Sequence, residues 1–145
     1  QPPDAKTIAF AMKCFDLLHK SSTGHYAVIE DAPIIVDLRI ARVSLTSGLL
    51  QIPGTAVSGL LQEATTIAAD HHQQIVDAWR AVHRKTGEIS LFRIDSLLWQ
   101  VAEPIFQERT NRNQAIARVV KVLAAAGIPP PMARLVATEL TAALD

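Results

Sequence analysis

Pro33-Ile-Ile-Val-Asp37-Leu-Arg-Ile-Ala-Arg42 is the stretch that decides the fold, because a β-branched apolar run changes there into an amphipathic helical pattern. Aspartate is a preferred N-cap residue, so we expect a helix to begin at Asp37 and to run to about Leu50. Residues 25–36, which precede it, are expected to form a loop or a short extended segment. This change of structure would hold the carboxylate of Asp37 at the start of a helix.

The rest of the chain has a helical pattern almost throughout. Pro2 and Pro3 precede Asp4, a suitable N-cap for a first helix that runs to about Lys20. Further helices are predicted over residues 56–86 with a break near 70, over 91–102 just before a proline, over 113–126 and over 131–144. About six helices with short connections predict a single all-α domain over residues 1–145.

The composition narrows the class of protein. The chain has 145 residues, of which 49% are hydrophobic and 19% are charged, which is typical of a globular domain. The 14 basic and 14 acidic residues balance, which is evidence against a generic nucleic-acid clamp. The apolar runs are too short to span a membrane. Cys14 is the single cysteine, which excludes an internal disulfide and a four-cysteine metal site; we expect it to be an inert buried thiol.

Lys6 and Asp37 form a pair that is suited to covalent chemistry on a sugar carbon. Both are placed at helix starts, so they can face one cleft. A lysine amine can attack the anomeric carbon of a nucleoside once it has lost its proton, whose pKa is ordinarily about 10.4. The positive end of a helix dipole disfavours the ammonium form of Lys6 and favours the ionised form of Asp37. A fixed carboxylate stabilises a developing oxocarbenium ion.

Two aromatic residues and a second acid extend this pattern. Phe10 follows Lys6 by four residues, and Trp99 follows Asp95 by four residues, so each pair shares a helix face. Phe10 and Trp99 can enclose a flat base, and Asp95 can accept hydrogen bonds from its Watson–Crick edge.

Each of these residues also has an ordinary structural interpretation. Lys6 is then an exposed lysine in a first turn, and Asp37 only caps its helix. Phe10 and Trp99 are then core residues, and Asp95 lies at the surface or caps a local turn. From the residues alone, these structural interpretations are preferred.

Three motifs, taken in order, resemble the archaeal 8-oxoguanine DNA glycosylase family, a branch of the helix-hairpin-helix glycosylase superfamily. They are Lys6-Thr-Ile-Ala-Phe-Ala-Met-Lys13, Pro33-Ile-Ile-Val-Asp37-Leu-Arg-Ile-Ala41 and Ile94-Asp-Ser-Leu-Leu-Trp99. The likeness covers roughly residues 4–103. It implies that Lys6 is the Schiff-base lysine and that Asp37 is the carboxylate of the apolar-Val-Asp motif.

The resemblance also implies how the base is held. Phe10 and Trp99 match the aromatic residues that stack on the flipped base, Asp95 matches the acid that binds its edge, and Lys13 matches a further lysine of the site. The resemblance implies DNA repair by a bifunctional glycosylase and AP lyase. That enzyme excises 8-oxoguanine from damaged double-stranded DNA by base flipping, Schiff-base formation and β-elimination.

The chain departs from the superfamily pattern in two places. Ile35 stands where a proline usually precedes the aspartate by two residues. Only the second helix of the helix-hairpin-helix is present, so its first helix and hairpin are expected upstream of Gln1. We therefore expect the chain to be the C-terminal portion of a longer protein, completed by an N-terminal segment or a second chain.

Two alternatives stay open at this point, a glycosylase for another damaged base and a non-catalytic helical module that binds DNA or protein. No metal or organic cofactor is expected, because His71 and His72 are adjacent and point about 100° apart on a helix. A cytoplasmic location at the prokaryotic nucleoid is expected, with no association with a membrane.

Overall fold

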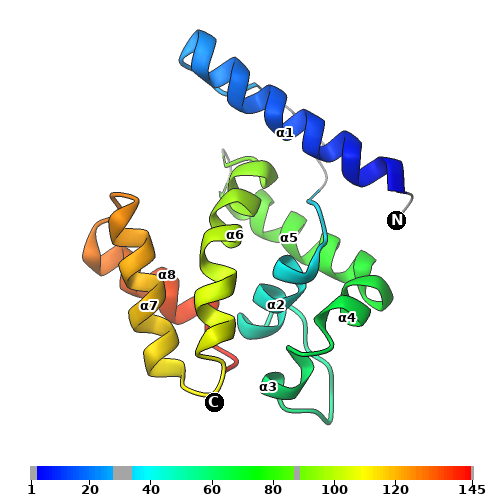
Figure 1. Cartoon of the computed structure of the whole chain (residues 1–145), viewed down its shortest axis with the longest axis vertical. Coiled ribbons are helices and arrows are strands. Elements are labelled where there is room, and N and C mark those ends of the chain that lie inside the picture. Colours follow the sequence, from blue (N-terminus) through cyan, green and yellow to red (C-terminus); the bar gives the residue numbers. More distant parts are fainter. Residues whose placement is uncertain (1–2, 28–33, 87–88, 145) are drawn as a thin grey trace.

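The computed structural model describes residues 3–27, 34–86 and 89–144, and the side chains of residues 3–6 lie outside that description. Within these ranges the chain forms α-helices and no strand, which confirms the all-α class (Figure 1). The helices are α1 (Pro3–Thr23), α2 (Leu38–Thr46), α3 (Val57–Leu60), α4 (Ala64–Asp70), α5 (His72–Thr86), α6 (Leu91–Gln107), α7 (Arg112–Ala125) and α8 (Pro130–Leu140).

The core is built around α2 and α6, which pack against each other. α4 packs on α2 and is followed by α5, while α7 packs on α6 and on α8, so the central pair has helices on both sides (Figure 1). Both central helices bury most of their apolar residues, as Ile40 and Val43 of α2 and Leu98 and Val101 of α6 illustrate. These periodic apolar positions explain why the sequence predicts helices here.

α1 lies across one end of α6, apart from the bundle (Figure 1). Ala9 and Asp16 are its buried residues among those whose side chains are described. The apolar face expected to need a partner is largely exposed, as the exposed fractions of Ile8, Phe10, Phe15 and Leu18 show (58%, 60%, 58% and 69%).

Cys14 belongs to this exposed helix. The prediction of a buried thiol is wrong, because Cys14 is exposed. The sequence pattern identified an apolar face correctly but implied that the bundle would cover it, and the described residues leave that face open.

Two helix ends differ from those expected. α2 ends at Thr46 and not near Leu50, because Gly48 adopts a φ of 75°, a left-handed conformation that ends a helix. α6 was expected to end at 102 but continues through Pro104 to Gln107. Proline leaves the carbonyl four residues earlier unbonded, and that residue, Gln100, is exposed, so water can reach it.

Several other boundaries agree with the sequence pattern, but the stretch from 56 to about 70, which was expected to be one helix, is divided into α3 and α4. The expected break near Asp70 separates α4 from α5, and α7 and α8 begin within one residue of the predicted positions. α1 begins at Pro3, so Asp4 lies in its first turn and is not its N-cap.

Among the described residues, no helix is both long and apolar enough to cross a membrane.

Candidate active site

Asp37 is held rigidly at the start of α2. It has an extended backbone, and its Oδ1 atom accepts hydrogen bonds from the backbone N–H groups of Arg39 (2.8 Å) and Ile40 (3.0 Å). This confirms the predicted N-cap. Because Oδ1 is used by the cap, Oδ2 is the oxygen that remains for other partners, and it lies 3.5 Å from Nη1 of Arg39.

A hollow of about 350 Å³ opens beside this carboxylate, and we call it the aromatic slot. Its lining residues are Thr7, Phe10, Ile35, Asp37, Arg39 and Trp99. The slot therefore brings together three residues that the sequence singled out from three separate helices or helix starts. Its volume falls in the lower part of the range of about 300–1,000 Å³ that is typical of small-molecule sites.

The two rings of the aromatic slot are not core residues. Phe10 is 60% exposed and Trp99 is 44% exposed, although each lies on a helix that buries other residues. The alternative that assigned them to the core is therefore wrong. Exposed aromatic rings that line a hollow are available to stack on a flat ligand.

Lys13 and Asp95 form an ion pair next to the slot. The Lys13 amine donates to Oδ2 of Asp95 at 2.5 Å and lies 5.7 Å from the centroid of the Trp99 ring. Asp95 is buried, so the alternative that placed it at the surface is wrong. These two residues do not line the slot itself, but Lys13 connects Asp95 to it.

The environment of Asp95 is unusual for a carboxyl group. Burial raises the pKa of Asp95, and the charge of Asp37 acts in the same direction, while the hydrogen bond and charge of Lys13 oppose the rise. Its Oδ1 atom is buried and has no hydrogen-bond partner among the described residues. A buried acceptor without a partner is costly, so it is a suitable group for a ligand that brings a donor.

Arg39 is a slot residue that the sequence analysis did not identify. Its guanidinium carbon lies 3.9 Å from the centroid of the Trp99 ring, close enough for a cation–π contact. Its position is part of the motif that contains Asp37, because Arg39 follows Asp37 by two residues. Its role depends on Trp99, which is 60 residues away in the chain, and the local pattern does not contain that contact.

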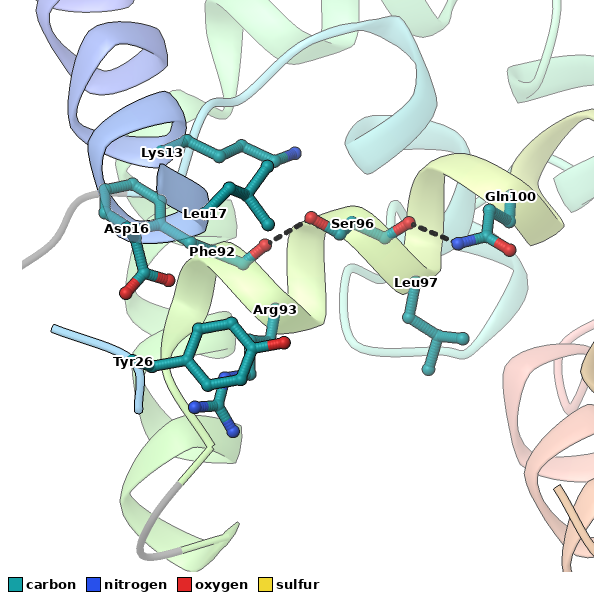
Figure 2. Close-up of a pocket in the computed structure, with 9 residues that line it drawn as sticks. All are labelled: Lys13, Asp16, Leu17, Tyr26, Phe92, Arg93, Ser96, Leu97 and Gln100. Carbon is teal, nitrogen blue, oxygen red and sulfur yellow. Dashed lines mark hydrogen bonds between the residues drawn. The ribbon is translucent and has the colours of Figure 1, made fainter. Parts of the chain in front are cut away.

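A second hollow of about 230 Å³ lies between α1 and the start of α6 (Figure 2). Figure 2 shows the Tyr26 ring against the guanidinium of Arg93, whose carbon is 3.3 Å from the ring centroid. Asp16 lines the same hollow and accepts the backbone N–H of Ala27 at 2.8 Å. These contacts hold the segment after α1 against α6.

Lys6 lies in α1, in the turn that leads to Thr7 and Phe10 of the slot. Its side chain is outside the described part of the structure, so the pairing with Asp37 stays a prediction. Pro33 also lies outside the described residues. In the remainder of the chain that is described, no three His, Cys, Asp or Glu side chains gather as a metal site.

The fold and the site define a class of protein, an all-helical domain in which two exposed aromatic rings line a hollow beside a helix-capping carboxylate. The chain belongs to the AGOG family of N-glycosylase/DNA lyases, whose family model matches residues 1–130. This confirms the family that the three sequence motifs indicated.

One curated relative has a related sequence. An N-glycosylase/DNA lyase of Pyrobaculum aerophilum is 31% identical over 97 residues, which are 66% of this chain and 33% of the relative. The chain therefore spans about a third of the length of the curated relative that it matches. No solved structure matches the chain.

Proposed function

We propose that the protein acts in base excision repair as a bifunctional DNA glycosylase and AP lyase that removes 8-oxoguanine from double-stranded DNA. The observation that carries this proposal is the aromatic slot, in which Phe10 and Trp99 flank a hollow beside the fixed carboxylate of Asp37. Enzymes that act on a base must take it out of the stack and hold it in a pocket of this kind.

The flipped base stacks between Phe10 and Trp99. Asp95 precedes Trp99 by four residues on α6, and its Oδ1 atom is buried without a partner among the described residues. We expect the entering base to reach this carboxylate, which then accepts hydrogen bonds from the N–H groups at the base edge. Lys13 stays paired with Asp95 and keeps that carboxylate in position. A guanine presents two neighbouring donors at this edge, N1–H and the amino group, so a base with a single donor there would satisfy the carboxylate less fully.

The chemistry begins with Lys6. Its amine attacks C1′ of the deoxyribose, the N-glycosidic bond breaks, and the base leaves with the bonding electron pair and takes up a proton. Asp37 stabilises the positive charge that develops on the sugar. The sugar ring then opens to a Schiff base with Lys6. β-Elimination removes a proton from C2′, the electron pair of that C–H bond forms a C2′–C3′ double bond, and the bond between C3′ and its oxygen breaks so that the phosphate leaves. No metal or organic cofactor enters these steps.

Borohydride trapping tests this proposal. The protein is incubated with an 8-oxoguanine duplex and sodium borohydride, which reduces a Schiff base to a stable cross-link. We expect a covalent complex with the wild type and none with Lys6→Gln, while Lys121→Gln, which alters an exposed lysine of α7, keeps it. Trapping that persists in Lys6→Gln would assign the nucleophile to another residue.

The remaining parts of the proposal concern the setting of the enzyme. We propose that a further polypeptide, an N-terminal segment or a second chain, completes the fold and covers the exposed apolar face of α1. Activity of the described chain alone, equal to that of the longer protein, would contradict this part. The cytoplasmic location also belongs to the proposal.

A further inference from the structure

Arg39 lines the aromatic slot and lies over the ring of Trp99. Its guanidinium carbon is 3.9 Å from the centroid of the Trp99 ring, so the guanidinium covers one face of that ring. Both side chains line the same slot, so the guanidinium stands beside the space in which a flat ligand would stack. The same guanidinium lies 3.5 Å from Oδ2 of Asp37, the oxygen that the helix cap leaves free.

The stability of α2 does not explain why an arginine stands at position 39. Arg39 is the second residue of α2, where the positive end of the helix dipole disfavours a cation. Its side chain is 43% exposed, so its burial in the core contributes little. The cap itself uses the backbone N–H of Arg39 and not the side chain.

Arg42, in the same helix, is an example of an arginine whose contact with an aromatic ring has a structural role. Arg42 lies 3.4 Å above the Phe106 ring, pairs with Glu103 and has a side chain that is only 13% exposed. Arg39 by contrast is open to solvent at the edge of a hollow, so it can leave its ring without disturbing the core.

We propose that Arg39 is a positioning residue that occupies the slot until the base enters. The inference rests on the proposed function. An entering base takes the Trp99 face, and the guanidinium moves out of the slot, where as a cation it can pair with a DNA phosphate. This exchange frees Oδ2 of Asp37 when the positive charge develops on the sugar, and it keeps the ring and the carboxylate covered when no base is present.

The first experiment measures whether Arg39 covers Trp99, with no DNA present. The chain has two tryptophans, and Trp79 is 3% exposed, so quenching of the fluorescence by acrylamide reports on Trp99. We expect stronger quenching in Arg39→Gln than in the wild type. Arg80→Gln is the control, because Arg80 is similarly exposed (45%) and lies 3.9 Å from Asp77, away from the slot. Equal quenching in all three proteins would overturn the proposal.

The second experiment measures competition for the slot with 8-oxo-2′-deoxyguanosine, a nucleoside without phosphate. We expect Arg39→Gln to bind it about two- to fivefold more tightly than the wild type, the change expected when an exposed cation–π competitor is removed. Arg80→Gln should bind like the wild type. Binding by Arg39→Gln that is equal to or weaker than that of the wild type would overturn the role of Arg39 and leave the proposed function standing. A further outcome is that acrylamide quenches Arg39→Gln more strongly, but neither the wild type nor Arg39→Gln binds the nucleoside. That result would overturn the entry of a base into the slot, and with it both the role of Arg39 and the proposed function.

Discussion

The Lys13 amine lies 2.5 Å from Oδ2 of Asp95, and this ion pair joins α1 to α6. Removal of one partner of a buried ion pair leaves the other charge without compensation, which typically costs about 3–5 kcal/mol. We expect Lys13→Met to lower the free energy of unfolding by about 3 kcal/mol, at the lower end of that range, because the Lys13 side chain retains 16% exposure. Urea unfolding measures this. Lys121→Met, at an exposed position of α7, is the matched control and should change the free energy of unfolding little.

The raised pKa of Asp95 predicts a pH dependence of stability. A carboxyl whose folded pKa exceeds its unfolded value binds more protons in the folded state, so its contribution to stability is present below the ordinary value of 3.8 and is lost as the pH rises through the folded pKa. Asp95→Asn does not titrate. We therefore expect the free energy of unfolding of the wild type to fall, relative to that of Asp95→Asn, as the pH rises above 3.8. A difference that is independent of pH contradicts this prediction.

Asp37 allows its capping role to be separated from its proposed catalytic role. Asparagine caps helices about as well as aspartate, whereas alanine costs about 1 kcal/mol. We expect Asp37→Asn to keep nearly full stability but to slow single-turnover base release by about 100-fold or more, because the fixed negative charge is lost. Asp37→Ala should lose both stability and rate. A normal rate of base release in Asp37→Asn would remove Asp37 from the chemistry.

Phe10 and Trp99 should matter for binding more than for folding. Stacking of a base on an aromatic side chain contributes about 1–3 kcal/mol, so we expect Phe10→Ala and Trp99→Ala each to weaken binding to an 8-oxoguanine duplex by about 5- to 150-fold. Because Phe10 is 60% exposed, its loss should cost little stability, whereas the loss of Trp99, which is 44% exposed, should cost more but less than that of a buried ring. Phe92→Ala is the contrast, since Phe92 is 2% exposed and its truncation should cost about 3–5 kcal/mol. Fluorescence anisotropy and urea unfolding measure the two effects.

Ser44 stabilises the core through a hydrogen bond. It accepts the indole N–H of Trp79 at 2.8 Å, and both residues are buried. Ser44→Ala leaves that donor unpaired, so we expect the free energy of unfolding to fall by about 1–3 kcal/mol. Ser47→Ala is the control. Ser47 is part-buried and only donates back to its own helix, so its loss should cost less, and an equal cost would argue against the role of the Trp79 bond.

The helical fold was predictable because its signals are local. The cap at Asp37 and the break at Asp70 depend on residues within one or two turns, and the sequence indicated both. The extension of α6 beyond Pro104 was not predictable, because it depends on packing of Ile105 against distant residues and on the exposure of Gln100.

The candidate site was predictable in part for the same reason. Helical spacing and the family resemblance identified Phe10, Asp37 and Trp99, which the structure brings to one hollow. Arg39 was missed because its contact with the Trp99 ring arises only when α2 and α6 pack together. The exposure of α1 was missed because an apolar periodicity indicates a face but does not identify what covers it.

The exposed position of Cys14 has a practical consequence. As the single thiol of the chain, it can be labelled by a maleimide dye without the removal of any other cysteine. The dye would sit on α1, one residue after Lys13. Energy transfer to that dye in a Trp79→Phe background, which leaves Trp99 as the donor, would then report any change in the distance between α1 and α6 as a duplex is bound.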